Sequence, residues 1–500
     1  MISDIGGARM SAELSNDVGA PPPPPPTAPA DDQVTSLKPK KFLGVRHVQY
    51  ALLFSVTILA YALRNVLNVA VIAMVKQRND FDVPTYPEWE SEKNVMLSAF
   101  FWGYVLTQIP AGQLAEYFGP KRFLSAAILT CSLFSVLIPV LGGQFGYGGV
   151  ILCRIVQGLT QGFIYPSIHH LISAWVPLAN RANIASFVYA GGPLGTVMVM
   201  PVAGYFSSSR LGWPMAFYAL GAVGLAWTVI WLVFGLDSPH HHKTITKEEL
   251  RYIQDGAIND KKPEKLPTPW REMATSLPCW AILICHFGSL WGFWTMLTEI
   301  PTYMDKILHF DIKSNSTLSA LPYLVYWILN LIMSPIADYL IVNKITSVGV
   351  SRKIFNSIGV FVPALALVGL VFVGAEERAW TVFLLVVAVG FNTAILCGFH
   401  VNHIDVAPRH AGTLMGITNA LGNCAAILAP LAVDLFKSIG GYQESDKALW
   451  NIVFITAAVL FASTGLFYNL FASGKVQPWN DPRNSEDASP QEKQPINEKK

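Results

Sequence analysis

Charge is what this chain has least of. Only 14% of its 500 residues are Asp, Glu, Lys or Arg, whereas soluble globular domains carry about 25%. Hydrophobic residues make up 52% of the chain. The formal net charge of +2 is also too small to indicate a nucleic-acid partner. These deficits exclude an ordinary soluble domain and predict a polytopic membrane protein.

Several chemical signatures are missing as well. The six cysteines occur without C-x-x-C pairs or His/Cys ligand spacing, so we expect small buried side chains and no metal site. No nucleophile, base and orienting group recur at a suitable spacing, which argues against an enzyme. The N-terminal region contains no apolar segment followed by a small-residue cleavage site, so we expect no cleaved signal peptide.

Long apolar runs are what the chain does contain. Crossing a hydrocarbon core of about 30 Å takes roughly 20 apolar residues. Runs of this length lie near residues 50–75, 95–115, 122–142, 148–172, 183–206, 213–235, 278–304, 316–341, 353–374, 379–402, 411–436 and 448–472. We therefore predict an all-α membrane protein with twelve transmembrane helices in two six-helix halves.

A polar stretch divides these runs into two sets. The N-terminal half is predicted at 46–235 and the C-terminal half at 278–474, with a cytoplasmic central loop at 236–277 between them. The tails at 1–45 and 475–500 are predicted to be disordered. Lys and Arg gather mainly in the tails and in the loops of one side, so the positive-inside rule places both termini in the cytoplasm.

The first apolar run carries Arg64 near its middle. A guanidinium stays protonated at accessible pH, and placing it at a bilayer centre costs from about 3 to more than 10 kcal/mol. Two interpretations remain open. Arg64 either has a structural role, paired with a buried carboxylate or capping a broken helix, or it faces a watery cavity and binds an anion through the fork of donors that matches carboxylate and phosphate oxygens.

The fourth run holds a second polar group, Arg154, Gln157 and Gln161. Their i, i+3, i+7 spacing places them on one face of a helix, and that face must turn to the bundle interior because lipid would not solvate it. They either bind substrate or form hydrogen bonds that hold helices together.

The tenth run ends in a cluster of His400, Asn402, His403 and Asp405. His-x-x-His spacing is found in zinc sites, but one such motif supplies too few ligands. We expect a cytoplasmic gate or a helix-end hydrogen-bond network here.

A glycine-rich loop with charges follows the second run. Its pattern, G-x-L-A-E-x-x-G-x-K-R, resembles a loop motif of the major facilitator superfamily, and its residues are Gly112, Glu116, Gly119, Lys121 and Arg122. Glycine permits a tight turn, and the acid and bases can form a charge-assisted latch between halves that breaks as they rock. We expect a conformational role rather than substrate contact.

Longer stretches resemble one family within that superfamily. FFWGYVLTQIPAGQLAEYFGPKR, RIVQGLTQGFIYPSIH, YAGGPLGT, LWGFWTMLTEIPTYM and GFHVNHIDVAPR occur in order. Together they resemble the anion:cation symporter family of sialin, the vesicular glutamate transporters and the sodium/phosphate cotransporters, from about Val45 to Pro482. TEIPTYM and SALPYL are most similar to sialin and to members like the inorganic phosphate cotransporters.

The resemblance implies a facilitator fold with a central anion site. In this family the arginine of the first helix contacts the acid group of the substrate, and Arg64 matches it. Arg154 and His169 also match family positions. Tyr104, Tyr189 and Trp294 occupy positions where relatives place aromatic side chains around the substrate.

The chain departs from the family at Gln157 and Gln161, where sialin-like members carry glutamates. An amide cannot titrate, so proton coupling through this helix is not expected. Transport is then driven by sodium, by the membrane potential or by neither, and Glu299 is the main intramembrane acid left for coupling.

We therefore predict a secondary transporter that moves an inorganic or organic anion, phosphate or a carboxylate, by alternating access. The alternatives are a sialin-like proton-coupled organic acid transporter, or a channel or sensor on the same scaffold. We expect no cofactor beyond a co-transported Na⁺ or H⁺, and as partners a small anion and the lipid bilayer, with no nucleic acid. The oligomeric state stays open, compatible with a monomer, and the membrane is the plasma membrane or an endolysosomal or vesicular one.

Overall fold

The computed structural model describes residues 44–76, 83–177, 180–242, 244–254, 268–374 and 376–480. Every regular element in these ranges is a helix. The predicted N-terminal tail up to residue 43, the tail after Asn480 and much of the central loop lie outside the described residues.

The N-terminal half consists of seven α-helices. They are α2 (Val45–Val75), α3 (Lys93–Phe118), α4 (Pro120–Phe145), α5 (Tyr147–Gln161), α6 (Ile164–Trp175), α7 (Arg181–Ser208) and α8 (Gly212–Phe234), with the 3₁₀ helix η1 (Pro87–Glu92) before α3. The central segment adds η3 (Pro239–His241), α9 (Lys247–Gln254) and α10 (Trp270–Thr275).

The C-terminal half repeats the arrangement. Its helices are α11 (Leu277–Lys306), α12 (Ile312–Val342), α13 (Val348–Phe372), α14 (Arg378–Asn392), η4 (Thr393–Leu396), α15 (Phe399–Val406), α16 (Ala411–Gly440), α17 (Lys447–Phe471) and η5 (Pro478–Asn480). In the described ranges, ten helices are long and apolar enough to cross a membrane, with 378–406 counted as one. Adding α3 and the broken pair α5–α6 to these ten gives the twelve crossings predicted.

The fourth crossing is broken, which its apolar pattern did not reveal. α5 ends at Gln161 and α6 begins at Ile164. Pro166 explains the break, because a proline ring clashes with the carbonyl four residues earlier, here that of Gly162, and supplies no N–H for it. The polar residues of this crossing therefore lie at the end of a half-helix.

The ordered chain also continues past the predicted end of the C-terminal half. Gln477 N–H donates to the carbonyl of Val406 at 2.9 Å, and Arg409 N–H donates to Asn480 Oδ1 at 3.1 Å. The segment up to Asn480 thus packs against the end of α15 instead of belonging to the tail.

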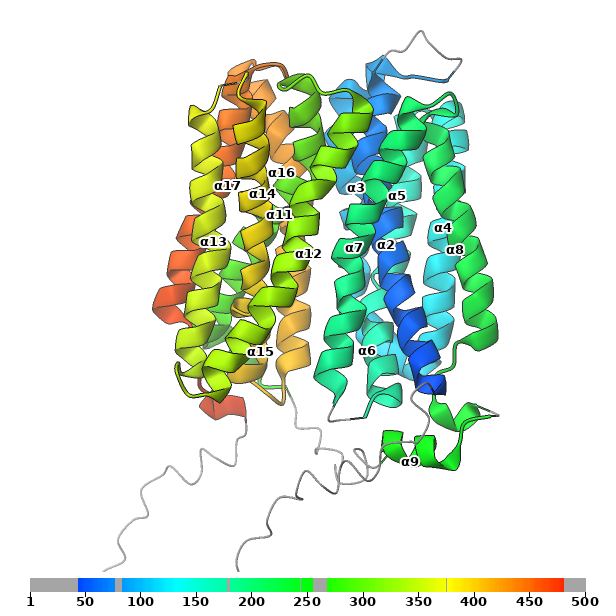
Figure 1. The fold of residues 1–500 in the computed structure, drawn as a ribbon, viewed down its shortest axis with the longest axis vertical. Helices are drawn as coiled ribbons and strands as arrows, with labels where there is room; N and C mark the ends of the chain where they lie inside the picture. The colour runs from blue at the N-terminus through cyan, green and yellow to red at the C-terminus, as the bar shows by residue number, and fades with distance from the viewer. Residues whose placement is uncertain are drawn as a thin grey trace, which may run out of the picture.

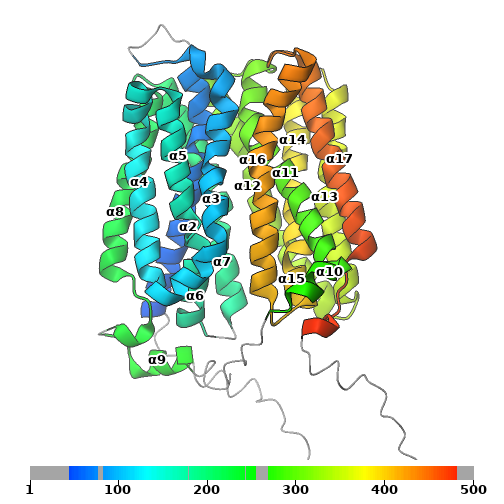
Figure 2. The ribbon, with the colours of Figure 1, turned by 180° about the vertical axis from the view of Figure 1, so that it is seen from behind.

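The two halves stand side by side as two bundles (Figures 1 and 2). They meet through α7 against α12 and α3 against α16. The start of α2, α9 and η5 lie at one end of the molecule, which we call the terminal end, and we call the opposite end the latched end (Figure 1).

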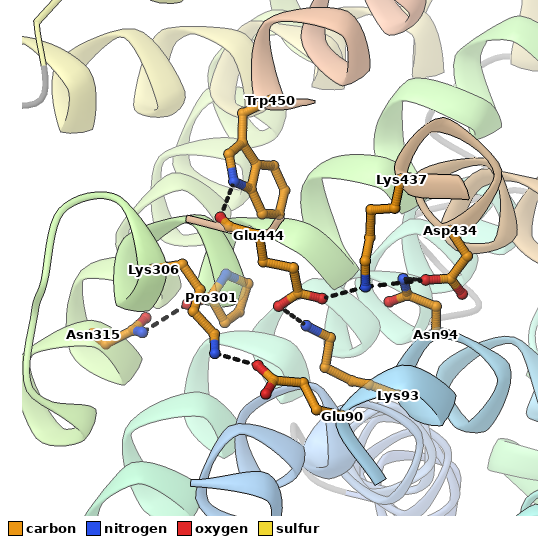
Figure 3. A network of polar contacts seen from close by, with 10 residues as sticks. All are labelled: Glu90, Lys93, Asn94, Pro301, Lys306, Asn315, Asp434, Lys437, Glu444 and Trp450. Carbon is orange, nitrogen blue, oxygen red and sulfur yellow. Dashed lines mark hydrogen bonds and ion pairs between the residues drawn. The ribbon is translucent and has the colours of Figure 1, made fainter. Parts of the chain in front are cut away.

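Ion pairs join the halves at the latched end (Figure 3). Lys93 Nζ lies 2.7 Å from Glu444 Oε2, and Asn94 Nδ2 donates to Asp434 Oδ1 at 2.8 Å. Lys437 contacts both of these acids. Two further pairs are Lys76 with Asp305, at 2.8 Å, and Glu90 with Lys306. We call this set of residues the latch.

The halves separate toward the terminal end. A Cβ on Gly204 of α7 would lie 1.7 Å from Ser316 Oγ of α12, so these two helices touch near the latched end. Near their other ends, Ser186 of α7 and Ser334, Asp338 and Tyr339 of α12 line a cavity of about 570 Å³. The two halves are therefore joined at the latched end, and α7 and α12 leave a cavity between them near the terminal end.

Candidate anion site

Arg64 lies inside the N-terminal half with only 4% of its surface exposed. Its Nε and Nη2 donate to Gln161 Oε1 at 3.3 and 3.1 Å. The amide of Gln161 in turn donates to the carbonyl of Ala60 at 3.0 Å. A neutral amide thus orients the guanidinium without cancelling its charge.

Three aromatic rings surround the same guanidinium. Its central carbon lies 4.9 Å from the ring centroid of Tyr61 and 4.7 Å from those of Phe100 and Tyr104. Ring faces attract a cation, by about 2 kcal/mol or more where water is excluded. These rings therefore offset part of the desolvation cost of Arg64.

Arg154 is the second buried guanidinium of this site, 1% exposed, and it contacts the same Phe100 ring as Arg64. Its central carbon lies 4.9 Å from the Phe100 centroid, and its Nη1 donates to Gln157 Oε1 at 3.4 Å. Gln157 is itself fixed by a hydrogen bond to the carbonyl of Cys131 at 3.0 Å. The Nε of Arg154 has no hydrogen-bond partner within the described structure.

Neither arginine forms an ion pair within the described ranges, so the interpretation of Arg64 as one member of a buried salt bridge finds no support there. Two positive charges buried without a counter-charge are costly. An anion with two or more oxygens would supply that counter-charge and fill the free donor of Arg154. This uncompensated charge is the main chemical feature of the site.

Close helix packing positions the pair. A Cβ on Gly158 of α5 would lie 1.9 Å from the backbone oxygen of Phe100, and one on Gly103 of α3 would lie 2.2 Å from that of Ile155. Only glycine permits this approach. It brings Phe100 and Tyr104 against the face of α5 that carries Arg154 and Gln161.

Two of the predicted substrate residues lie at the edges of the site. Tyr189 packs on Tyr165 at 5.5 Å between ring centroids and has its hydroxyl 3.5 Å from His169 Nδ1. Trp294, from the C-terminal half, packs on Phe101 at 4.4 Å. Within the described residues neither of them forms a hydrogen bond or ring contact with Arg64. Tyr104 and Gln161 contact Arg64, and Gln157 contacts Arg154.

Sequence reasoning missed three aromatic residues of the site. The Phe100 ring contacts both arginines, and Tyr61 stacks on Arg64. Tyr165 donates from its hydroxyl to that of Tyr61 at 3.1 Å. The available signal was helical spacing, since Phe100 lies four residues before Tyr104 and Tyr61 three before Arg64.

The predicted loop motif lies at the terminal end of the N-terminal half. Gly119 adopts φ 91°, which favours glycine, and joins α3 to α4. Lys121 N–H donates to Asp237 Oδ1 at 2.6 Å, and its ammonium donates to the carbonyl of Leu232 at 3.0 Å. Both contacts stay within this half, and Arg122 follows on α4. Gly112 and Glu116 lie on α3, but the structure describes only their backbone, so the gating role of this motif stays a prediction.

The cluster at the end of the tenth crossing forms a network within the C-terminal half. Asp405 pairs with Arg352 at 2.7 Å, and Asn402 donates to Asp405 at 3.2 Å and to the carbonyl of Ser473 at 2.9 Å. His403 Nε2 lies 2.7 Å from Thr418 Oγ1, and its ring lies beside that of His400. Among the residues that the structure describes, no group of three metal-ligating side chains occurs.

The sequence positions Asn315 in a glycosylation tripeptide, yet the structure buries it. Asn315 is 2% exposed, and its amide donates to the carbonyl of Pro301 at 2.7 Å (Figure 3). A glycan could reach its nitrogen only if this hydrogen bond broke and the first turns of α12 unfolded.

Two packed helical halves, a charge-bearing centre and a one-sided latch are typical of an alternating-access carrier. The family model described as Major Facilitator Superfamily matches residues 53–430. The chain belongs to this superfamily. Its members are membrane transporters, so the prediction of a transporter rather than an enzyme is confirmed.

Individual relatives show which group of facilitators the chain resembles in sequence. The chain is 38% identical over 449 residues to a protein of Drosophila ananassae described as "Putative inorganic phosphate cotransporter", covering 85% of this chain and 92% of that protein. It is 36% identical over 394 residues to sialin of Ovis aries, covering 78% of this chain and 77% of sialin. The predicted membership of this group of facilitators is confirmed.

A solved structure supports the fold. An inward-facing, unoccupied bacterial homolog of the human lysosomal transporter Spinster matches with a TM-score of 0.64 at 14% identity, over 87% of this chain and 99% of that chain. The predicted twelve-helix facilitator fold is confirmed.

Proposed function

We propose that this facilitator moves a small anion, inorganic phosphate or a carboxylate, and that Arg64 is the main contact of the anion. The observation that supports this most directly is the burial of Arg64 and Arg154 beside one ring with amide partners and no carboxylate in the described ranges. The relatives are described as a phosphate cotransporter and sialin. Phosphate and carboxylate share the oxygen geometry that a guanidinium fork binds.

Alternating access follows from the latch and the cavity. We infer that in the present state the anion enters from the terminal end, where α7 and α12 line a cavity. Parting the latch and joining the terminal ends of α7 and α12 would expose the centre to the other side. The anion then crosses when the halves rock around Arg64, without passage through a continuous pore.

We propose further that the terminal end faces the cytoplasm. Lys121, Lys344 and Arg352 lie at the terminal ends of α4, α12 and α13, whereas the lysines of the latch are paired with carboxylates. Basic residues near membrane helices accumulate on the cytoplasmic side. An epitope on the C-terminal tail should bind antibody only after cells are permeabilised, and binding to intact cells would contradict this orientation.

Counterflow in proteoliposomes tests the anion directly. Vesicles are preloaded with unlabelled inorganic phosphate, glutamate, N-acetylneuraminate or urate, and uptake of the same labelled compound is followed. A carrier gives a transient accumulation above equilibrium, which a channel cannot produce. We expect this for phosphate or for one of the carboxylates. Uptake no greater than in protein-free vesicles for the whole panel would contradict the proposal.

Charge exchange across the latch provides a separate prediction. Lys93→Glu alone should favour the state that is open at the latched end, because breaking a buried ion pair costs about 3–5 kcal/mol. Adding Glu444→Lys should restore part of the closed population. Cysteine accessibility at the latched end measures the change, and Lys313→Glu, on α12 outside the latch, is the charge-matched control.

Only strong acid should weaken the ion pair of Lys93 and Glu444. Burial opposes the charged form of Glu444, but the ammonium groups of Lys93 and Lys437 outweigh it and hold the pKa of Glu444 below its ordinary value. A lowered carboxyl pKa contributes stability that is present above the ordinary pKa and is lost as the pH falls through the lowered one. The Lys93–Glu444 pair is therefore intact at neutral and mildly acid pH.

A further inference from the structure

Glu299 is a buried acid without a visible partner. It lies on α11 near the latched end and is 1% exposed. Neither carboxyl oxygen has a hydrogen-bond partner in the described structure, and the same holds for the hydroxyl of Thr302, one helical turn later. Thr302 lines a cavity of about 60 Å³ together with Lys93 and Lys306. Such a space admits a few water molecules.

The charges that face Glu299 are already balanced among themselves. They come from Lys93 on α3, Asp434 on α16 and Glu444 in the turn before α17. Lys437 completes the group through its contacts with both of these acids. Two ammonium groups thus meet two carboxylates, and Lys93 already gives its shortest contact, 2.7 Å, to Glu444.

An ionised Glu299 would therefore be an unpaired negative charge inside the closed latch. Burying such a charge without hydrogen bonds costs several kcal/mol, and a protein avoids this by taking up a proton. When the halves part at the latched end, water reaches the side chain and the charged form becomes favourable. Closure and ionisation of Glu299 therefore oppose each other.

We propose that Glu299 is a proton-binding site linked to the latch. Its carboxylate takes a proton from hydronium in the solution at the latched end as the latch closes, which leaves a neutral carboxyl group and water, and it returns the proton when the latch opens. Acid on that side then promotes the step that carries the anion toward the terminal end. The inference requires alternating access but not any particular anion.

Distance measurements across the latched end test this linkage. Spin labels on Leu211→Cys, between α7 and α8, and Glu376→Cys, between α13 and α14, report the separation of the two halves, and both positions are exposed. The full chain is placed in lipid nanodiscs and measured between about pH 5 and pH 9, a range in which an ordinary ion-paired carboxylate stays charged. Singly labelled chains correct for the native cysteines.

We expect the short distance of the closed state to dominate at low pH. At high pH the ratio of the long-distance to the short-distance population should rise at least about tenfold, because the release of one proton changes such a ratio tenfold per pH unit. Glu299→Gln should hold the short distance at every pH. Glu88→Gln, which removes an exposed acid of η1 outside the latch, should keep the response. Glu299→Met provides a second neutral variant should the glutamine variant fail to fold.

Three results would overturn the inference. The first is a wild-type distance that does not change with pH, and the second is a pH response that persists in the folded neutral variants. The third is a distance that changes when sodium replaces choline at constant pH, which would mean that sodium and not a proton controls the latch. None of these depends on counterflow of phosphate or of a carboxylate. Failure of the proton site and failure of the anion proposal are therefore distinguishable.

Discussion

Replacing Arg64 by alanine should reduce anion counterflow by roughly 100-fold or more. Removing a buried charge that pairs with a ligand costs about 2–5 kcal/mol, and about 3 kcal/mol already corresponds to a factor above 100. Arg154 is held by its own amide partner, Gln157, at 3.4 Å, so it does not occupy the place that Arg64 leaves. The measurement is initial uptake per folded transporter in proteoliposomes.

Two further variants serve as controls for the Arg64→Ala result. Arg64→Lys keeps the charge but loses the fork and the flat face that stacks on Tyr61 and Tyr104, so we expect intermediate uptake. Arg210→Ala removes an exposed arginine between α7 and α8 and should leave uptake unchanged. Uptake near the wild-type level in a folded Arg64→Ala variant would show that the anion does not bind at Arg64.

Gln161→Glu should weaken anion binding at least about tenfold and make it depend on pH. The side-chain oxygen of Gln161 already lies 3.1 Å from Arg64 Nη2 and 3.3 Å from Nε. A carboxylate in this position would form a bidentate ion pair and compete with the anion for the same donors. The apparent KM should then fall again as acid protonates the new carboxylate.

The neutral control is Gln161→Leu. It removes the amide without adding charge, so the anion keeps its attraction to Arg64 and the apparent KM should change only a few-fold. If Gln161→Glu binds the anion as tightly as the wild type at neutral pH, then the anion does not share the donors that Gln161 contacts.

Local sequence patterns predicted a large part of this molecule. Twelve apolar runs predict the twelve crossings because the length and apolar composition of each segment are enough to place it in the bilayer. Arg64 stands out as a charge in such a run, and the i, i+3, i+7 spacing of Arg154, Gln157 and Gln161 predicts one shared face. In the structure this face contacts Arg64 through Gln161.

The latch could not be predicted in the same way. Lys93 and Glu444 are 351 residues apart in sequence, and no periodicity links them. In the sequence, the lysines of the latched end only reduced the difference in Lys and Arg content between the loops on the two sides of the membrane. Phe100 was missed because its local signal, the four-residue spacing to Tyr104, is equally typical of a phenylalanine that packs in an apolar core.

The one-sided latch also sets how the carrier behaves from its two faces. A latch that holds the resting molecule closed on one side leaves only a small fraction of molecules able to accept anion from that side. The apparent dissociation constant equals the intrinsic one divided by the competent fraction. Half-saturation should therefore require more anion at the latched face than at the terminal face, although both faces lead to the same Arg64.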